Sequence, residues 1–195
     1  MNDDGGVKSI LLAGVGGQGI LRASDILCYV MMEAGMDVKK SEVHGMAQRG
    51  GCVTSHVRYG EKVYSPIASQ GDVDILVSFE KLETLRYLNY LKPEGHIIMS
   101  DREIYPPSVN LGDAPYPRNI IESVKKICRI IKIVNASSMA LKAGDIRTEN
   151  TALLGVLSSY LRQPDISLWE KVIRASFPQK AIEVNLKAFH FGRAA

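Results

Sequence analysis

The stretch ILLAGVGGQGIL, residues 10–21, decides the fold. An apolar run leads into four glycines within six positions, and an amphipathic pattern begins directly after them. Apolar runs that end in glycine are typical of buried parallel strands, so residues 7–15 are predicted to form one. Helical spacing of apolar residues over 20–34 predicts a helix that ends at Gly35. A second strand over 36–43 completes a strand–loop–helix–strand unit.

The pattern after this unit departs from simple alternation. Residues 52–59 alternate with a period of two, and Gly60-Glu61 suits a two-residue hairpin turn, so an antiparallel excursion is expected. The βα rhythm then resumes with predicted strands at 73–79, 96–101 and 130–134, and helices at 82–91 and 120–127. Four of the eight prolines fall in 102–118, which is expected to be an irregular surface crossing.

The whole chain is therefore predicted to be a single α/β domain, 1–195. Its core, about 7–136, is expected to be a Rossmann-like, mostly parallel doubly wound sheet with an antiparallel hairpin excursion. A C-terminal helical extension, about 137–195, is expected to be broken near Pro164 and Pro178.

Composition limits the classes of function. With 46% hydrophobic and 23% charged residues, the 195-residue chain is typical of a globular protein, and a net charge of +3 does not favour nucleic acid. No apolar run approaches the length of a membrane span, and the acidic N-terminus does not resemble a signal peptide, so a cytoplasmic location is expected. The three cysteines lack C-x-x-C spacing, so this chain is not expected to hold an iron–sulfur cluster.

The glycine loop fits G-x-G-x-x-G through Gly14, Gly16 and Gly19, with Gly17 and Gln18 between them. Free N–H groups and the positive end of a helix dipole favour an anion at such a loop. Glu42 is the candidate for the acidic residue that would bind a ribose. A nicotinamide or flavin dinucleotide site, a turn kept for packing, and a turn that serves an interface all remain open.

A second glycine cluster lies in HGMAQRGG, 44–51, which is predicted to be a loop. This cluster has a guanidinium, that of Arg49, next to two residues without side chains, Gly50 and Gly51. Such an arrangement suits the binding of a phosphate, a carboxylate or a partner's backbone. A solvent-facing arginine before a glycine bend is the alternative. The nearby histidines have no acidic or thiol partner at ligand spacing, so no metal site is expected.

A catalytic constellation is not evident in the sequence. G-x-S-x-G is missing, and Ser137-Ser138 is interpreted as a helix N-cap. Glu80, Glu83 and Asp101 lie near predicted strand ends, where α/β sheets carry functional groups, but such residues are also usual at solvated helix starts.

Several long segments carry a family resemblance. The chain resembles the gamma-type domain of the 2-oxoacid:ferredoxin oxidoreductases, and within that family the indolepyruvate type. The segments that match are GVGGQGIL (14–21), SEVHGMAQRGGCVTSHVRYG (41–60), DILVSFEKLETLRYL (74–88), VNASSMALKAGDIRTENTALLG (134–155) and KAIEVNLKAFHFG (180–192). The resemblance covers nearly the full chain. Asp145 departs from it, because related sequences often carry Asn there.

The resemblance implies a heteromeric enzyme whose large subunit carries thiamine diphosphate, magnesium and [4Fe-4S] clusters. That complex converts an aryl-pyruvate to an acyl-CoA, with CoA as a substrate and ferredoxin as the electron acceptor. No Gly-Asp pair in this chain is followed by glycine, so the thiamine diphosphate motif is missing, as are cluster cysteines. This chain is therefore expected to be the small subunit, to bind no cofactor tightly and to be inactive alone.

The two glycine-rich loops are expected to form one surface that faces the large subunit, near the CoA side of the site. That surface comprises Gly14, Gly16, Gly17, Gln18, Gly19, Arg49, Gly50 and Gly51. A stand-alone nucleotide-dependent dehydrogenase and a non-catalytic interaction module are the alternatives. Without its partner the chain is expected to expose an apolar patch and to form homodimers.

Overall fold

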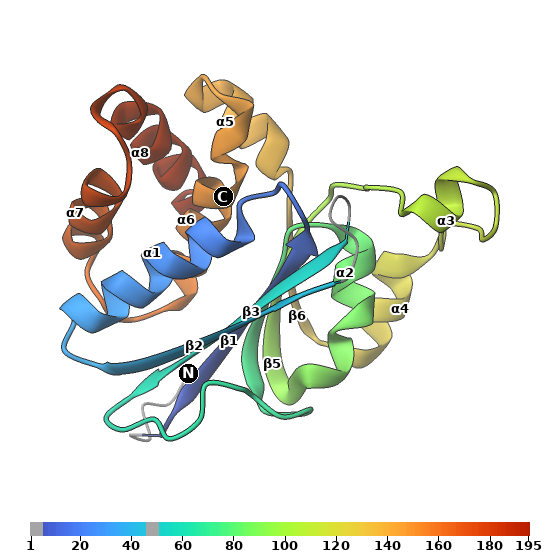
Figure 1. The fold of residues 1–195 in the computed structure, drawn as a ribbon, viewed down its shortest axis with the longest axis horizontal. Coiled ribbons are helices and arrows are strands. Elements are labelled where there is room, and N and C mark those ends of the chain that lie inside the picture. Colours follow the sequence, from blue (N-terminus) through green and yellow to red (C-terminus); the bar gives the residue numbers. More distant parts are fainter. Residues whose placement is uncertain (1–5, 46–50) are drawn as a thin grey trace.

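The computed structural model describes residues 6–45 and 51–195, which form a sheet with helices on both faces (Figure 1). The strands are β1 (Lys8–Val15), β2 (Asp37–His44), β3 (Cys52–Gly60), β4 (Val73–Ser78), β5 (Leu91–Ser100) and β6 (Ile130–Val134). The helices are α1 (Ile20–Glu33), α2 (Lys81–Arg86), α3 (Pro107–Asn110), α4 (Ile120–Ile127), α5 (Ala136–Ala143), α6 (Glu149–Tyr160), α7 (Ile166–Ser176) and α8 (Gln179–Arg193). Two 3-10 turns complete the fold, η1 (Leu88–Tyr90) and η2 (Ile146–Thr148).

The strand order is β2-β3-β1-β4-β5-β6. β1, β4, β5 and β6 run parallel, whereas β3 is antiparallel to both of its neighbours, β1 and β2. The predicted class, a mostly parallel Rossmann-like sheet with an antiparallel excursion and C-terminal helices, is confirmed.

The predicted hairpin turn is wrong in its position. Gly60 ends β3, and residues 61–72 contain no strand that returns along it. The antiparallel hairpin is instead formed by β2 and β3, so its turn comes before β3 in the sequence and not after it. The reason is that β1 and β2 occupy both edges of β3, so a strand after Gly60 would find no free ladder there.

The two faces of the sheet are covered by different helices. On one face α1, α6, α7 and α8 pack on alternate strand residues such as Leu12 and Val77. On the other face α2 and α4 pack on the intervening residues, such as Leu11 and Leu76. The central strands are therefore buried on both sides, which explains why they are nearly continuous apolar runs in the sequence.

The helix predicted over 82–91 is shorter than expected. α2 ends at Arg86, and Leu91 is already the first residue of β5, where it pairs with Val73. The leucine spacing continues past the end of α2 because Leu88 and Leu91 pack in the same hydrophobic cluster as Leu82 and Leu85, on the α2–α4 side of the sheet. The start of β5 at Leu91 is determined by strand pairing, which cannot be predicted from a helical period in the sequence.

His56 gives the fold a pH dependence. It lies on β3, is 5% exposed, and its Nδ1 accepts the Ala68 N–H at 3.4 Å. Burial, together with the charge of Arg58, lowers the pKa of His56 below its ordinary 6.5. The unfolded chain therefore binds a proton more readily, so this contribution to stability is complete above pH 6.5 and is lost as the pH falls below it.

We expect the free energy of unfolding to fall by roughly 1 kcal/mol from this histidine between pH 7.5 and 5. Urea denaturation at both pH values checks this. His56→Gln keeps an acceptor but does not titrate, so it is expected to show a smaller pH difference than the wild type. An equal pH difference in the variant would assign the effect to other groups, such as His96, whose pKa burial also lowers.

Candidate functional site

The glycine loop lies at the topological switch point of the sheet, where the helices that follow two neighbouring strands cover opposite faces. The helix after β1 covers one face and the helix after β4 covers the other, so a crevice is expected between the carboxyl ends of these two strands. In doubly wound sheets this crevice is where ligands bind. The glycine loop therefore lies at the position of such a crevice in the fold.

Gln18 fills this crevice with its own side chain. Its Oε1 accepts the Val15 N–H at 2.7 Å, and its Nε2 donates to the carbonyl oxygen of Phe79 at 2.8 Å. Gly14 makes room for this arrangement, because a Cβ there would lie 2.8 Å from both Gln18 Oε1 and the Cβ of Phe79. The first glycine of the motif thus serves packing around Gln18, where a dinucleotide would need open space.

Gly19, the third glycine of the motif, packs against the C-terminal helices. Its φ is +76°, and a Cβ would lie 2.6 Å from Nδ2 of Asn150, which donates to the Gly19 carbonyl oxygen at 3.2 Å. Asn150 belongs to a buried network in which Thr151 Oγ1 donates to Asn185 Oδ1 at 2.7 Å. α6 and α8 therefore hold the loop at the start of α1.

Gly16 and Gly17 are the exposed part of the loop. The Gly16 N–H donates to the Gly51 carbonyl oxygen at 3.0 Å, which joins the two glycine clusters through their backbones. Gly17 has a φ of +99° and nothing within 4 Å of a built Cβ. The structure thus brings Gly51 beside the glycine loop, as the sequence predicted, whereas Arg49 and Gly50 lie outside the described residues.

Glu42 does not take the position of a ribose-binding acid. It lies on β2, which β3 separates from β1, and its carboxylate pairs with Lys40 at 2.5 Å. In a dinucleotide-binding unit the acidic residue ends the strand next to β1. The inserted strand therefore breaks the geometry that the motif requires.

Two of the carboxylates near the strand ends, those of Glu80 and Glu83, have structural partners. Glu80 is fully buried, where it caps α2 by accepting the Glu83 N–H at 3.1 Å and also accepts the Tyr116 hydroxyl at 2.6 Å. Glu83 pairs with Arg86 at 3.2 Å. Asp101 continues the sheet by donating its N–H to Val134. Glu80 thus anchors the 102–118 crossing.

The expected N-cap at Ser137-Ser138 is wrong by two residues. Asn135 caps α5, since its Oδ1 accepts the Ser138 N–H at 2.7 Å. The Ser137 hydroxyl instead donates to Glu149, which also pairs with Arg102. Two helices, α5 and α6, and the segment after β5 therefore meet at a buried carboxylate that no local spacing in the sequence indicated.

Cys52 lies beside Gly51 but is not a reactive thiol. Its Sγ is 2.9 Å from the hydroxyl of Tyr87, and burial raises the pKa of Cys52 to about 12. Thiolates are the reactive form of cysteine, so this side chain stays inert near neutral pH. Across residues 6–45 and 51–195, no three His, Cys, Asp or Glu side chains are placed to hold a metal ion.

Comparison with known proteins identifies the family. A family model described as pyruvate ferredoxin/flavodoxin oxidoreductase matches residues 9–195. The chain belongs to this family. Indolepyruvate oxidoreductase subunit IorB of Thermococcus kodakarensis is 42% identical over 193 residues, which cover 94% of this chain and 93% of the relative. The IorB subunit of Archaeoglobus fulgidus is 40% identical over 187 residues, 94% and 92% of the two chains.

Solved structures share the fold. The pyruvate oxidoreductase subunit PORC of Thermotoga maritima superposes with a TM-score of 0.73 at 23% identity, over 96% of both chains. A 2-oxoglutarate:ferredoxin oxidoreductase of Magnetococcus marinus gives 0.74 at 21% identity, over 96% of this chain and 30% of that one. The α/β architecture is thus that of the family. None of the described helices is long and apolar enough to cross a membrane.

Proposed function

We propose that this chain is the small subunit of a heteromeric 2-oxoacid:ferredoxin oxidoreductase of the indolepyruvate type, working in the cytoplasm. The observation that carries the proposal is the match, over more than nine-tenths of both chains, to relatives named as IorB subunits of indolepyruvate oxidoreductases. In the proposed complex a larger subunit holds thiamine diphosphate, magnesium and [4Fe-4S] clusters. The complex releases CO2 from an aryl-pyruvate, transfers the acyl group to CoA, and passes two electrons to ferredoxin.

The role proposed for this chain is to shape the interface or the CoA side of the site. The exposed backbone of Gly16 and Gly17, joined to Gly51, is the supporting geometry, and Arg49 and Gly50 complete the proposed surface. Large apolar side chains are exposed around the same carboxyl edge of the sheet: Val43, Tyr105, Leu111, Leu141 and Ile146. Exposed apolar groups that gather along one edge favour a protein partner there.

Gly16→Glu tests this surface. A Cβ at Gly16 would meet no atom closer than 3.7 Å, so the fold is expected to tolerate the change, and a carboxylate suits the start of α1. In the interface, however, the added side chain would have to fit between two packed surfaces. We expect co-purification of the co-expressed large subunit, and turnover with it, to fall at least about tenfold, because overpacking costs about 1–3 kcal/mol.

Tyr64→Glu is the matched control, because Tyr64 is 89% exposed and follows β3 at the opposite edge of the sheet. It should leave association unchanged. Arg49→Ala is expected to weaken association or CoA use while the chain remains folded. If Gly16→Glu co-purifies as the wild type does, the glycine-loop edge is not the interface.

We also expect the glycine loop, residues 14–19, to bind no dinucleotide cofactor. Because Gln18 occupies the crevice and β3 separates Glu42 from β1, NAD, NADP and FAD are expected not to bind the purified chain tightly. Isothermal titration of each cofactor into the chain measures this. Stoichiometric binding of any of them would favour the stand-alone dehydrogenase, as would turnover of a 2-oxoacid by the chain alone.

A further inference from the structure

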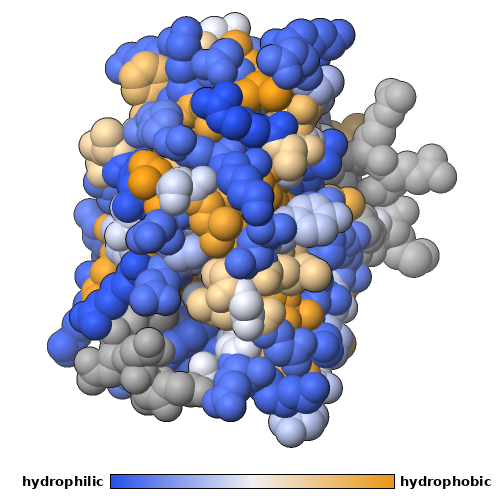
Figure 2. All heavy atoms as spheres, turned by 90° about the vertical axis from the view of Figure 1, so that its left-hand side faces the viewer, coloured by the Kyte–Doolittle hydropathy of each residue, from blue (hydrophilic) through white to orange (hydrophobic). Residues whose placement is uncertain are grey.

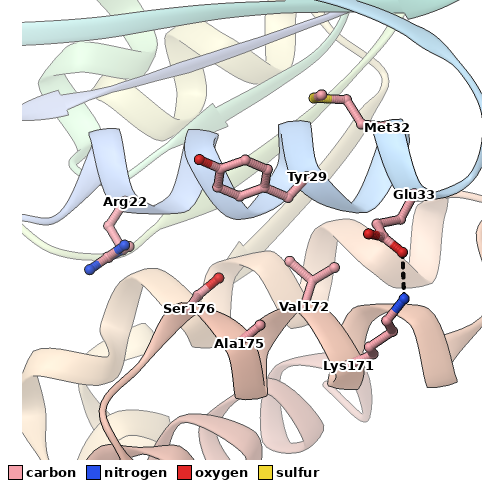
Figure 3. Close-up of a pocket in the computed structure, with 8 residues that line it drawn as sticks. All are labelled: Arg22, Tyr29, Met32, Glu33, Lys171, Val172, Ala175 and Ser176. Carbon is pink, nitrogen blue, oxygen red and sulfur yellow. Dashed lines mark hydrogen bonds and ion pairs between the residues drawn. The ribbon is translucent and has the colours of Figure 1, made fainter.

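A groove lies between α1 and α7 (Figure 3). Its volume is about 620 Å³, and its apolar lining is formed by Tyr29 and Met32 of α1 and by Val172 and Ala175 of α7. The ion pair between Glu33 and Lys171, 2.5 Å long, bridges the two helices at one end. Small side chains on α7 leave the groove hollow.

Tyr29 and Met32 are largely accessible to solvent, at 54% and 56% exposure. They are one helical turn apart, so they are neighbours on the surface of α1. Figure 2 shows hydrophobic residues in small patches between hydrophilic ones on this side of the molecule. An apolar surface rimmed by charge is typical of an interaction site. The arrangement of that charge indicates the partner.

Arg22, Tyr29 and Glu33 lie along one exposed stripe of α1, which we call the α1 stripe. They are spaced by seven and four residues, so they share a helix face, with opposite charges about 16 Å apart at its two ends. Arg22 stacks over the ring of Phe177 at 5.6 Å and makes no ion pair with any described residue. The cationic end of the stripe therefore has a positioned but uncompensated charge.

We propose that the α1 stripe docks on the α1 stripe of a second copy of this chain, with the two helices antiparallel about a two-fold axis. Reversing the stripe places Arg22 of each copy opposite Glu33 of the other, so both ends form ion pairs. In this register the two Tyr29 side chains are offset by only three residues, or about 4.5 Å along the helix. Each ring can then pack on the other ring and on the hollow groove.

The self-complementarity depends on direction. A parallel pairing would place Arg22 against Arg22 and Glu33 against Glu33, which is unfavourable. The antiparallel pairing instead gives Glu33 two cations, Lys171 of its own chain and Arg22 of the second copy. Arg22 lies in the first turn of α1, next to the glycine loop, so binding of the large subunit is measured alongside the dimer.

A charge-swap cycle on the full chain tests the proposal. Sedimentation equilibrium over a concentration series should show a dimer for the wild type. Arg22→Glu and Glu33→Arg each replace two symmetric attractions by repulsions, so each should raise the dissociation constant about tenfold or more. The double variant restores opposite charges across the axis and should return to within about threefold of the wild type.

Lys187→Glu, an exposed α8 cation given the same change of charge, controls for net repulsion and should leave the dimer unchanged. Lys171→Ala separates loss of the internal ion pair from loss of the dimer, and should also leave it intact. Tyr29→Cys chains should be joined by a short bismaleimide, whereas wild-type chains should not. A monomeric wild type, or single variants without rescue in the double variant, would overturn the proposal. So would single variants that stay dimeric but lose the large subunit.

Discussion

Gly155→Ala is expected to lower the free energy of unfolding by roughly 3 kcal/mol, even though alanine is the better helix former by about 1 kcal/mol. The reason is the crossing of α6 and α8. A Cβ at Gly155 would lie 2.0 Å from the Phe189 carbonyl oxygen, and one at Gly192 would lie 1.9 Å from that of Ala152. These are backbone atoms, so the two helices would have to separate.

Urea denaturation followed by circular dichroism measures this loss. Ser159→Ala is the control, because Ser159 is on the exposed side of the same helix and its hydroxyl bonds only to the Val156 carbonyl. It should be neutral or slightly stabilising. A Gly155→Ala midpoint close to that of Ser159→Ala would show that α6 and α8 do not cross in backbone contact.

Gly19→Ala is expected to cost about 2–4 kcal/mol, from strain at positive φ and from loss of the Asn150 contact. The φ of +76° disfavours any side chain, and the new Cβ would displace the buried Asn150 amide, 2.6 Å away. Asn150 would then lose the Gly19 carbonyl as its acceptor. The same denaturation measurement detects the change.

Gly17→Ala separates strain from crowding. Its φ of +99° carries a similar backbone penalty, but nothing lies within 4 Å of its Cβ, so about 1–2 kcal/mol is expected. The difference between the two variants should shrink when Asn150 is replaced by alanine, because the crowded amide is then gone. Equal losses for Gly17→Ala and Gly19→Ala would refute a packing role for Asn150.

Local sequence patterns are sufficient to predict the elements whose residues contact others close to them in the sequence. The apolar run that became β1 and the helical spacing of α1 gave elements within one or two residues of those observed. The positions of α4 and β6 were predicted equally well. Gly51 beside the loop was also expected, since both glycine clusters end strands at one edge.

Contacts between distant segments could not be predicted in this way. β3 pairs with both β1 and β2, and no local period reports which edges a strand will occupy. Asn150 reaches Gly19 across 131 residues, and Gln18 reaches Phe79 across 61. The G-x-G-x-x-G spacing shows only that side chains are absent at these glycines. It does not show whether a ligand or another part of the protein occupies the space beside them.

The sequence by itself determined the α/β class, the strand–glycine loop–helix start and the family, because these depend on short-range periodicity and on the residues of long continuous motifs. Only the tertiary structure decided the use of the loop. Gln18 and Asn150 occupy the space beside Gly14 and Gly19, since folding brings Phe79, α6 and the inserted β3 to the end of β1. Close packing leaves Gly16 and Gly17 as the exposed remainder of the loop.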